Sequence, residues 1–138
     1  MHFPMVQALK NTASKRIYAV AMLVGSVLCT TLGFAKAPNP IGGLEIIQFA
    51  QLPPQGRVTY QLIQQGGPFP FDKDGSVFGN RERILPSQQR GYYREYTVKT
   101  AGAGNRGAKR IVCGGPPRAP TACFYTSDHY ASFRHIVE

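Results

Sequence analysis

Short alternating runs separated by glycine and proline dominate the C-terminal half of the chain. In residues 91–100 (GYYREYTVKT) the alternation is typical of a β-strand, with Tyr93, Glu95 and Thr97 on one face. Three further strands are predicted at 108–114, 121–127 and 130–138. Because short turns containing Gly or Pro join these runs, consecutive strands are expected to pair as an antiparallel meander.

One helix is predicted ahead of these strands, over residues 55–67 (QGRVTYQLIQQGG). Val58, Leu62 and Ile63 fall on one helical face, and two glycines mark the end. A helix followed by such strands predicts an α+β fold, with one main helix packed on a twisted antiparallel β-sheet. The opposite face of the sheet is then open to bind a ligand.

The N-terminus has the pattern of a secretory signal peptide. Lys10, Lys15 and Arg16 precede an apolar run at 17–35 that ends in small residues suited to cleavage after Ala35. An uncleaved anchor is the alternative, because the run is just long enough to span a bilayer. Its Gly, Ser and Thr content favours cleavage.

Residues 1–35 are therefore expected to be removed on export, which leaves room for one domain. We expect residues 36–52, rich in Pro and Gly, to form an irregular N-terminal lead-in, with Ile46, Ile47 and Phe49 docking on a domain at 53–138.

Charge and cysteines limit the class of protein. Sixteen basic against seven acidic residues give a net charge of +9, which favours a polyanionic partner, although basic charge also serves solubility. Cys113 and Cys123 are the two cysteines outside the signal peptide. In an exported domain they predict one disulfide, with two free thiols as the alternative.

Three features could carry chemistry. Glu95 is either a surface ion-pair partner or a general base held among positive charges. Arg106 and Arg110 lie in NRGAKR, where guanidinium groups suit a phosphate, although a solvated basic hairpin is the simpler interpretation. His129 could exchange a proton near neutral pH, but a lone histidine is more often structural.

Together these residues suggest a base, an anion clamp and an acid for attack at phosphorus without a metal or cofactor. The spacing of His129 and His135, with no Cys or acid to complete a ligand set, does not match a metal site. For Asp128 we expect a role in shaping the loop rather than in orienting the His129 ring.

Four motifs, FGNRERILP, GYYREYTV, NRGAKRI and TSDHYASF, occur in this order over residues 53–133. In this they resemble the bacterial guanyl-specific extracellular ribonucleases of the barnase and ribonuclease Sa type, more closely the ribonuclease Sa branch. The resemblance implies the microbial ribonuclease fold and cleavage of single-stranded RNA 3′ of guanosine, through a 2′,3′-cyclic phosphate to a 3′-phosphate.

Residue roles follow from the same resemblance. It implies that Glu95 is the general base, that His129 is the general acid and that Arg106 and Arg110 hold the phosphate. Tyr130 then borders the phosphate site. The guanine-binding loop would contain Phe78, Asn80, Arg81 and Glu82. In that family the glutamate carboxylate accepts from guanine N1–H and the amine, which adenine cannot satisfy.

Two other functions compete with this one: a catalytically silent RNA- or polyanion-binding module, and a glycan hydrolase using Glu82 and Glu95. The intact base, clamp and acid favour the ribonuclease. The resemblance further implies a small acidic inhibitor protein of the barstar type as a partner. We also expect a secreted monomer without stable membrane association once processed.

Overall fold

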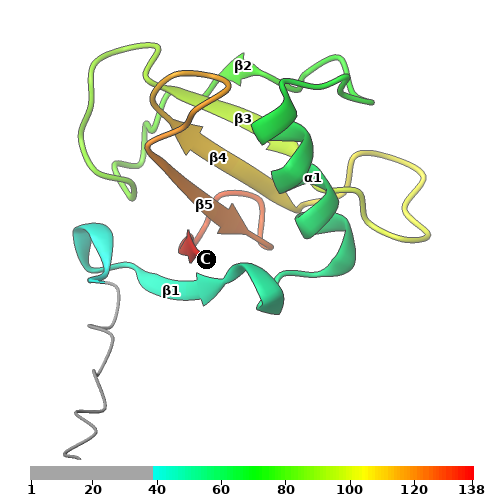
Figure 1. The fold of residues 1–138 in the computed structure, drawn as a ribbon, viewed down its shortest axis with the longest axis horizontal. Helices are drawn as coiled ribbons and strands as arrows, with labels where there is room; N and C mark the ends of the chain where they lie inside the picture. Colours follow the sequence, from blue (N-terminus) through cyan, green and yellow to red (C-terminus); the bar gives the residue numbers. More distant parts are fainter. Residues whose placement is uncertain (1–38) are drawn as a thin grey trace, which may run out of the picture. The chain divides into compact units, whose positions relative to one another are not determined.

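The computed structural model describes residues 39–138, so the predicted signal peptide lies outside the described residues. Helix α1 (Pro54–Gln65) lies over one face of a six-stranded sheet (Figure 1). The strands are β1 (Glu45–Gln48), β2 (Ser76–Val77), β3 (Tyr93–Thr97), β4 (Arg110–Gly114), β5 (Ala122–Thr126) and β6 (Arg134–Val137). The predicted α+β fold is confirmed.

The sheet order is β1-β6-β5-β4-β3-β2. Every pair from β2 to β6 is antiparallel, which confirms the predicted meander. The exception is β1, which pairs in parallel with β6. None of the helices in residues 39–138 is long and apolar enough to cross a membrane.

Strand β1 corrects the expectation of an irregular lead-in over 36–52. Its Ile47 is buried and pairs with Ile136 of β6. After the strand, Phe49 packs against Tyr60 of α1 with ring centroids 5.4 Å apart. Docking through Ile47 and Phe49 was therefore predicted correctly, whereas the strand was missed, because its partner lies at the other end of the chain.

Helix α1 begins with Pro54 and ends at Gly66, whose left-handed φ of 81° is a conformation that glycine adopts easily. Its buried residues are Gly56, Thr59 and Ile63. Val58 was expected on the buried face, but it is 50% exposed. The buried face instead includes Thr59, whose hydroxyl donates a hydrogen bond to the Thr97 carbonyl of β3 at 3.2 Å.

The sheet buries an apolar cluster on each of its faces. On the side of α1, Ile63 packs with strand residues such as Tyr96 and Ile111. On the opposite side, Tyr93, Val112, Phe124 and Phe133 form a second cluster with Leu85. The face opposite the helix is therefore only partly open, since residues from the 78–86 and 127–133 loops cover part of it.

The predicted disulfide is confirmed: Cys113 and Cys123 are bonded and directly opposite each other in the β4–β5 ladder. Both side chains belong to the cluster on the helix side.

The last predicted strand, 130–138, is shorter than expected. Strand β6 begins at Arg134, and residues 127–133 form a turn in which His129 and Tyr130 have positive φ values of 55° and 71°. Alternation alone did not reveal this turn, which hydrogen bonds to the Asp128 side chain stabilise.

Candidate active site

Strand register places the charged groups of the site on the face opposite α1. Glu95 lies opposite Val112, whose side chain is in the cluster on that face. Thr97 lies opposite Arg110, two residues along the same strands. Because side chains two residues apart share a face, Glu95, Thr97 and Arg110 point to the same side of the sheet. The predicted alternation is thus confirmed for 93–97, the part of 91–100 that forms β3, whereas Tyr92 packs with the cluster of Tyr93 and not on the opposite face.

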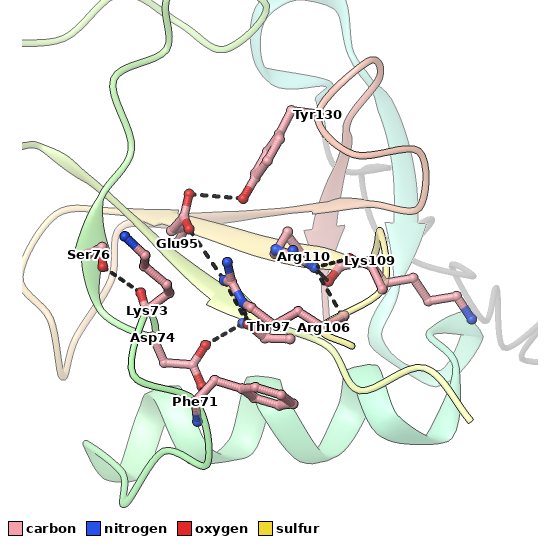
Figure 2. Close-up of polar contacts among 11 residues, drawn as sticks. Phe71, Lys73, Asp74, Ser76, Glu95, Thr97, Arg106, Lys109, Arg110 and Tyr130 are labelled. Carbon is pink, nitrogen blue, oxygen red and sulfur yellow. Dashed lines mark hydrogen bonds and ion pairs between the residues drawn. The ribbon is translucent and has the colours of Figure 1, made fainter. Parts of the chain in front are cut away.

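Glu95 is held by two side chains from other parts of the chain (Figure 2). Its Oε1 is 3.4 Å from Nη2 of Arg106, and its Oε2 accepts a hydrogen bond of 2.9 Å from the Tyr130 hydroxyl. Glu95 is 16% exposed and Arg106 is 30% exposed, so both are accessible to a ligand. Burial raises the pKa of Tyr130, and its hydrogen bond to the Glu95 carboxylate raises it further.

Arg110 is anchored by backbone carbonyls rather than by a carboxylate. Its Nη1 donates to the carbonyls of Gly107 and Lys109 at 2.9 and 2.8 Å, and more weakly to Arg106 at 3.4 Å. The residue is only 3% exposed, and its buried Nε has no hydrogen-bond partner within residues 39–138. Its guanidinium carbon is 5.9 Å from the centre of the Tyr130 ring.

A glycine in the preceding loop allows this anchoring. Gly107 has a φ of 64°, and a β-carbon there would collide with the Thr100 side chain. Its N–H is held by the Asn105 side chain at 2.8 Å. The left-handed conformation of Gly107 therefore occurs at a position whose carbonyl accepts a hydrogen bond from Arg110.

The turn at 127–133 presents His129 to solvent. The His129 N–H donates to the Ala108 carbonyl at 3.1 Å, which ties the turn to the segment that leads into β4. Asp128 accepts hydrogen bonds from the Thr126 hydroxyl at 2.8 Å and from the Ser132 N–H and hydroxyl at 2.9 and 2.5 Å. The bonds from Ser132 and then Thr126 lower the Asp128 pKa to about 2. Asp128 shapes the loop, as predicted.

The predicted guanine-binding loop is closed by one amide side chain. Asn80, with a φ of 48°, donates from Nδ2 to the Leu85 carbonyl at 2.9 Å and accepts from the Leu85 N–H at 3.1 Å. The ring of Phe78, the first residue of the loop, stacks on Tyr130 with centroids 5.2 Å apart. The loop is therefore preformed and joined to the 127–133 turn by aromatic contact.

A cavity of about 830 Å³ brings most of the predicted site together. It is lined by Phe78, Asn80, Arg81, Glu82, Glu95, His129 and Tyr130, and also by residues that the sequence analysis did not single out: Val77, Gly79, Ile84, Ala131 and Phe133. Arg106 and Arg110 do not line it; they contact its Glu95 and Tyr130.

The second histidine within residues 39–138, His135, has a structural position. The ring of His135 packs against Phe124 at 5.4 Å, and burial lowers its pKa. Within residues 39–138 no cluster of three or more His, Cys, Asp or Glu side chains is arranged to hold a metal ion. Sequence reasoning gave no role to Asp74 and only a face to Thr97, although both are bonded into the site.

A family model described as ribonuclease matches residues 35–137. The chain belongs to the ribonuclease family. This ribonuclease is 52% identical over 95 residues to guanyl-specific ribonuclease St of Saccharopolyspora erythraea, an alignment that covers 69% of this chain and 90% of that protein. It is also 52% identical over 85 residues to guanyl-specific ribonuclease Sa of Kitasatospora aureofaciens, with 62% and 85% covered.

Solved structures agree with this membership. A structure of ribonuclease Sa2 with mononucleotides superposes on this ribonuclease with a TM-score of 0.64 at 41% identity, covering 69% of this chain and 95% of that one. A second structure of Sa2, with guanosine-2′-cyclophosphate, has a TM-score of 0.62. The resemblance to the ribonuclease Sa type is therefore confirmed.

Proposed function

We propose that this ribonuclease is a guanyl-specific endoribonuclease that cleaves single-stranded RNA on the 3′ side of guanosine. The observation that carries the proposal is one cavity in which Glu82, Glu95 and His129 meet, with two arginines at its edge. Relatives at about half identity are named guanyl-specific ribonucleases, which supports the same base preference.

The first step requires a base and an acid on opposite sides of a phosphate. Glu95 takes the proton of the ribose 2′-hydroxyl, whose oxygen then attacks phosphorus. His129 gives a proton to the departing 5′-oxygen, and a 2′,3′-cyclic phosphate results. In the second step His129 takes a proton from water, which opens the ring, and Glu95 returns a proton to the 2′-oxygen to leave a 3′-phosphate.

The arginines stabilise the charge that develops on the phosphate oxygens. Arg110 fits this role because a buried cation normally has an anionic partner, whereas within residues 39–138 its contacts are carbonyls. A phosphate would supply the missing counter-charge and an acceptor for Nε. Arg106 serves the same phosphate while it stays close to Glu95.

Guanine selectivity comes from the loop at 78–82. We assign the Glu82 carboxylate to guanine N1–H and the exocyclic amine, and loop N–H groups to O6. Asn80 holds the loop in shape through Leu85. Phe78 and Tyr130 offer aromatic faces for the base, and Arg81 also lines the cavity. Adenine lacks N1–H, so it would leave the Glu82 carboxylate unpaired.

We also propose that residues 1–35 act as a cleaved export signal and that the ribonuclease works outside the cell as a monomer. Without that segment, the chain has thirteen basic and seven acidic residues. Such a basic domain would attract a small acidic inhibitor protein of the barstar type, which would protect the producing cell.

Cleavage of dinucleotides tests the central claim. Residues 36–138 should cleave GpC much faster than ApC, with or without EDTA, and form the cyclic phosphate before the 3′-phosphate. Glu95→Ala and His129→Ala should abolish most activity, whereas Glu82→Ala should reduce the GpC to ApC preference. Salt-dependent RNA binding with no product would instead indicate a silent binding module.

A further inference from the structure

The guanidinium of Arg106 lies between the hydroxyl of Thr97 and the carboxylate of the proposed general base, Glu95 (Figure 2). Thr97 is 2% exposed, and its hydroxyl oxygen accepts two hydrogen bonds from Arg106: 3.0 Å from Nε and 2.8 Å from Nη2. The same Nη2 is 3.4 Å from Glu95. Both contacts with Thr97 are shorter than the contact with the carboxylate, so the hydroxyl determines the orientation of the guanidinium.

Arg106 needs such an anchor because its own backbone gives little support. It follows a loop, 101–105, whose residues are all exposed. An arginine side chain has many rotamers, and fixing one of them costs conformational entropy. The Thr97 acceptor fixes the Arg106 side chain in the free enzyme. Little further side-chain entropy is therefore lost when the guanidinium binds a phosphate.

Thr97 is itself fixed from several directions. Its N–H donates to Oδ1 of Asp74 at 2.7 Å, and its carbonyl accepts from the Thr59 hydroxyl of α1 at 3.2 Å. It is paired with Arg110 across the β3–β4 ladder. The second oxygen of Asp74 accepts from the Phe71 N–H at 3.3 Å. The hydroxyl therefore has a defined position before substrate arrives.

The geometry also explains why Arg106 does not form a closed ion pair with the general base, Glu95. A free arginine beside a carboxylate tends to form two parallel hydrogen bonds with it. Here Nε and Nη2 are directed to Thr97, and Glu95 receives one long contact from Arg106 and one hydrogen bond from Tyr130. Within residues 39–138, Nη1 of Arg106 makes no hydrogen bond, so it is free for a phosphate oxygen.

We propose that Thr97 is a positioning residue of this ribonuclease. It holds Arg106 near Glu95 without letting the two form a closed ion pair, so that the base stays available and the arginine can bind the phosphate. This inference rests on the proposed function, because it assigns Thr97 to the same site.

Two substitutions separate the hydroxyl from the shape of the residue. Thr97→Val keeps the branched shape and removes the acceptor, whereas Thr97→Ser keeps the acceptor. With GpC as substrate, Thr97→Val should lower kcat by about 10- to 100-fold, the range expected for lost hydrogen bonds to a charged group. Thr97→Ser should stay within about threefold of the wild type, since its hydroxyl can still accept both bonds.

Ligand binding tests whether the effect passes through the arginine. Thr97→Val should weaken binding of 3′-GMP by roughly tenfold and leave binding of guanosine unchanged, because only 3′-GMP carries the phosphate. In an Arg106→Ala background, Thr97→Val should weaken 3′-GMP binding no further, as expected of two residues that act as a unit.

A matched control removes another buried threonine hydroxyl. Thr59→Val loses only the hydrogen bond to the Thr97 carbonyl, whereas the bond from the Thr97 N–H to Asp74, the pairing with Arg110 and the contacts of the Thr97 hydroxyl with Arg106 remain. It should lower the melting temperature without changing the ratio of 3′-GMP to guanosine affinity. If Thr97 had only a structural role, Thr97→Val would likewise lower the melting temperature and leave the ratio of 3′-GMP to guanosine affinity unchanged.

Three results would overturn the inference: wild-type kcat in Thr97→Val, equal losses of 3′-GMP and guanosine affinity, or a Thr97→Val effect that persists without Arg106. Failure of the proposed function is distinguishable, since the wild type itself would then not cleave GpC.

Discussion

Reduction of the Cys113–Cys123 disulfide is expected to lower the free energy of unfolding by about 3 kcal/mol. The bridge joins residues ten positions apart. Closing a loop of that length in the unfolded chain costs an entropy of ~9 cal/mol/K, or ~3 kcal/mol at 25 °C. Against a typical total of about 5–15 kcal/mol for one domain, the effect is large. The melting temperature should fall by roughly 10–20 °C.

Urea denaturation of oxidised and reduced wild type is the assay of choice, because both forms keep the two buried sulfur atoms. The reduced form should also show a larger m-value, since its unfolded chain exposes more surface. The native hairpin should survive reduction, as the Thr121 N–H still donates to the Gly114 carbonyl at 2.7 Å. Cleavage of GpC at 25 °C should therefore be unchanged.

The cysteines face the helix side of the sheet, whereas Glu95 lies on the other side. A stability difference below about 1 kcal/mol would refute the loop-entropy argument. A loss of activity on reduction, in protein that remains folded, would refute the claim that the bridge and the site are independent.

Two further predictions concern the 127–133 turn and the pH dependence of stability. Asp128→Ala removes the acceptor for Thr126 and Ser132 and should lower the free energy of unfolding in urea by about 1–2 kcal/mol. It should lower kcat more than it lowers the affinity for guanosine. Asp128→Asn should recover part of the stability and part of kcat. Burial lowers the pKa of His135, so the unfolded chain binds the proton more readily as the pH falls below about 6.5, and stability should decline there. His135→Gln should lack that decline between pH 7 and 5, and an unchanged slope would contradict the assignment. The Asp128 pKa of about 2 adds stability that is present above pH 3.8 and is lost as the pH falls through 2.

Local patterns were sufficient for much of the site. The alternation around Glu95 predicted which residues share its face, because a strand repeats every two residues whatever its neighbours are. The disulfide followed from two cysteines flanking a turn rich in Gly and Pro. A loop-shaping role was expected for Asp128 because adjacent side chains on an extended chain point to opposite faces, so Asp128 was a poor partner for the His129 ring.

Other features required partners distant in the sequence. Strand β1 is stabilised by β6, about ninety residues later, and four residues carry too weak a pattern to reveal it. Val58 has the helical spacing of a buried residue, yet it is exposed, and the neighbouring Thr59 is buried in contact with β3. The turn at His129 interrupts an apparently regular alternation, and the His129 N–H ties it to the Ala108 carbonyl of a separate segment at 3.1 Å.

Residue type and spacing along the chain were sufficient for the main helix, for strands β3 to β6, for the chemistry of the candidate groups and for the family. Only the tertiary structure decided how the groups meet. The contact between Thr97 and Arg106 and the hydrogen bond from Tyr130 to Glu95 each join separate segments. Such contacts depend on sheet register and loop closure, which act over distances that no local pattern encodes.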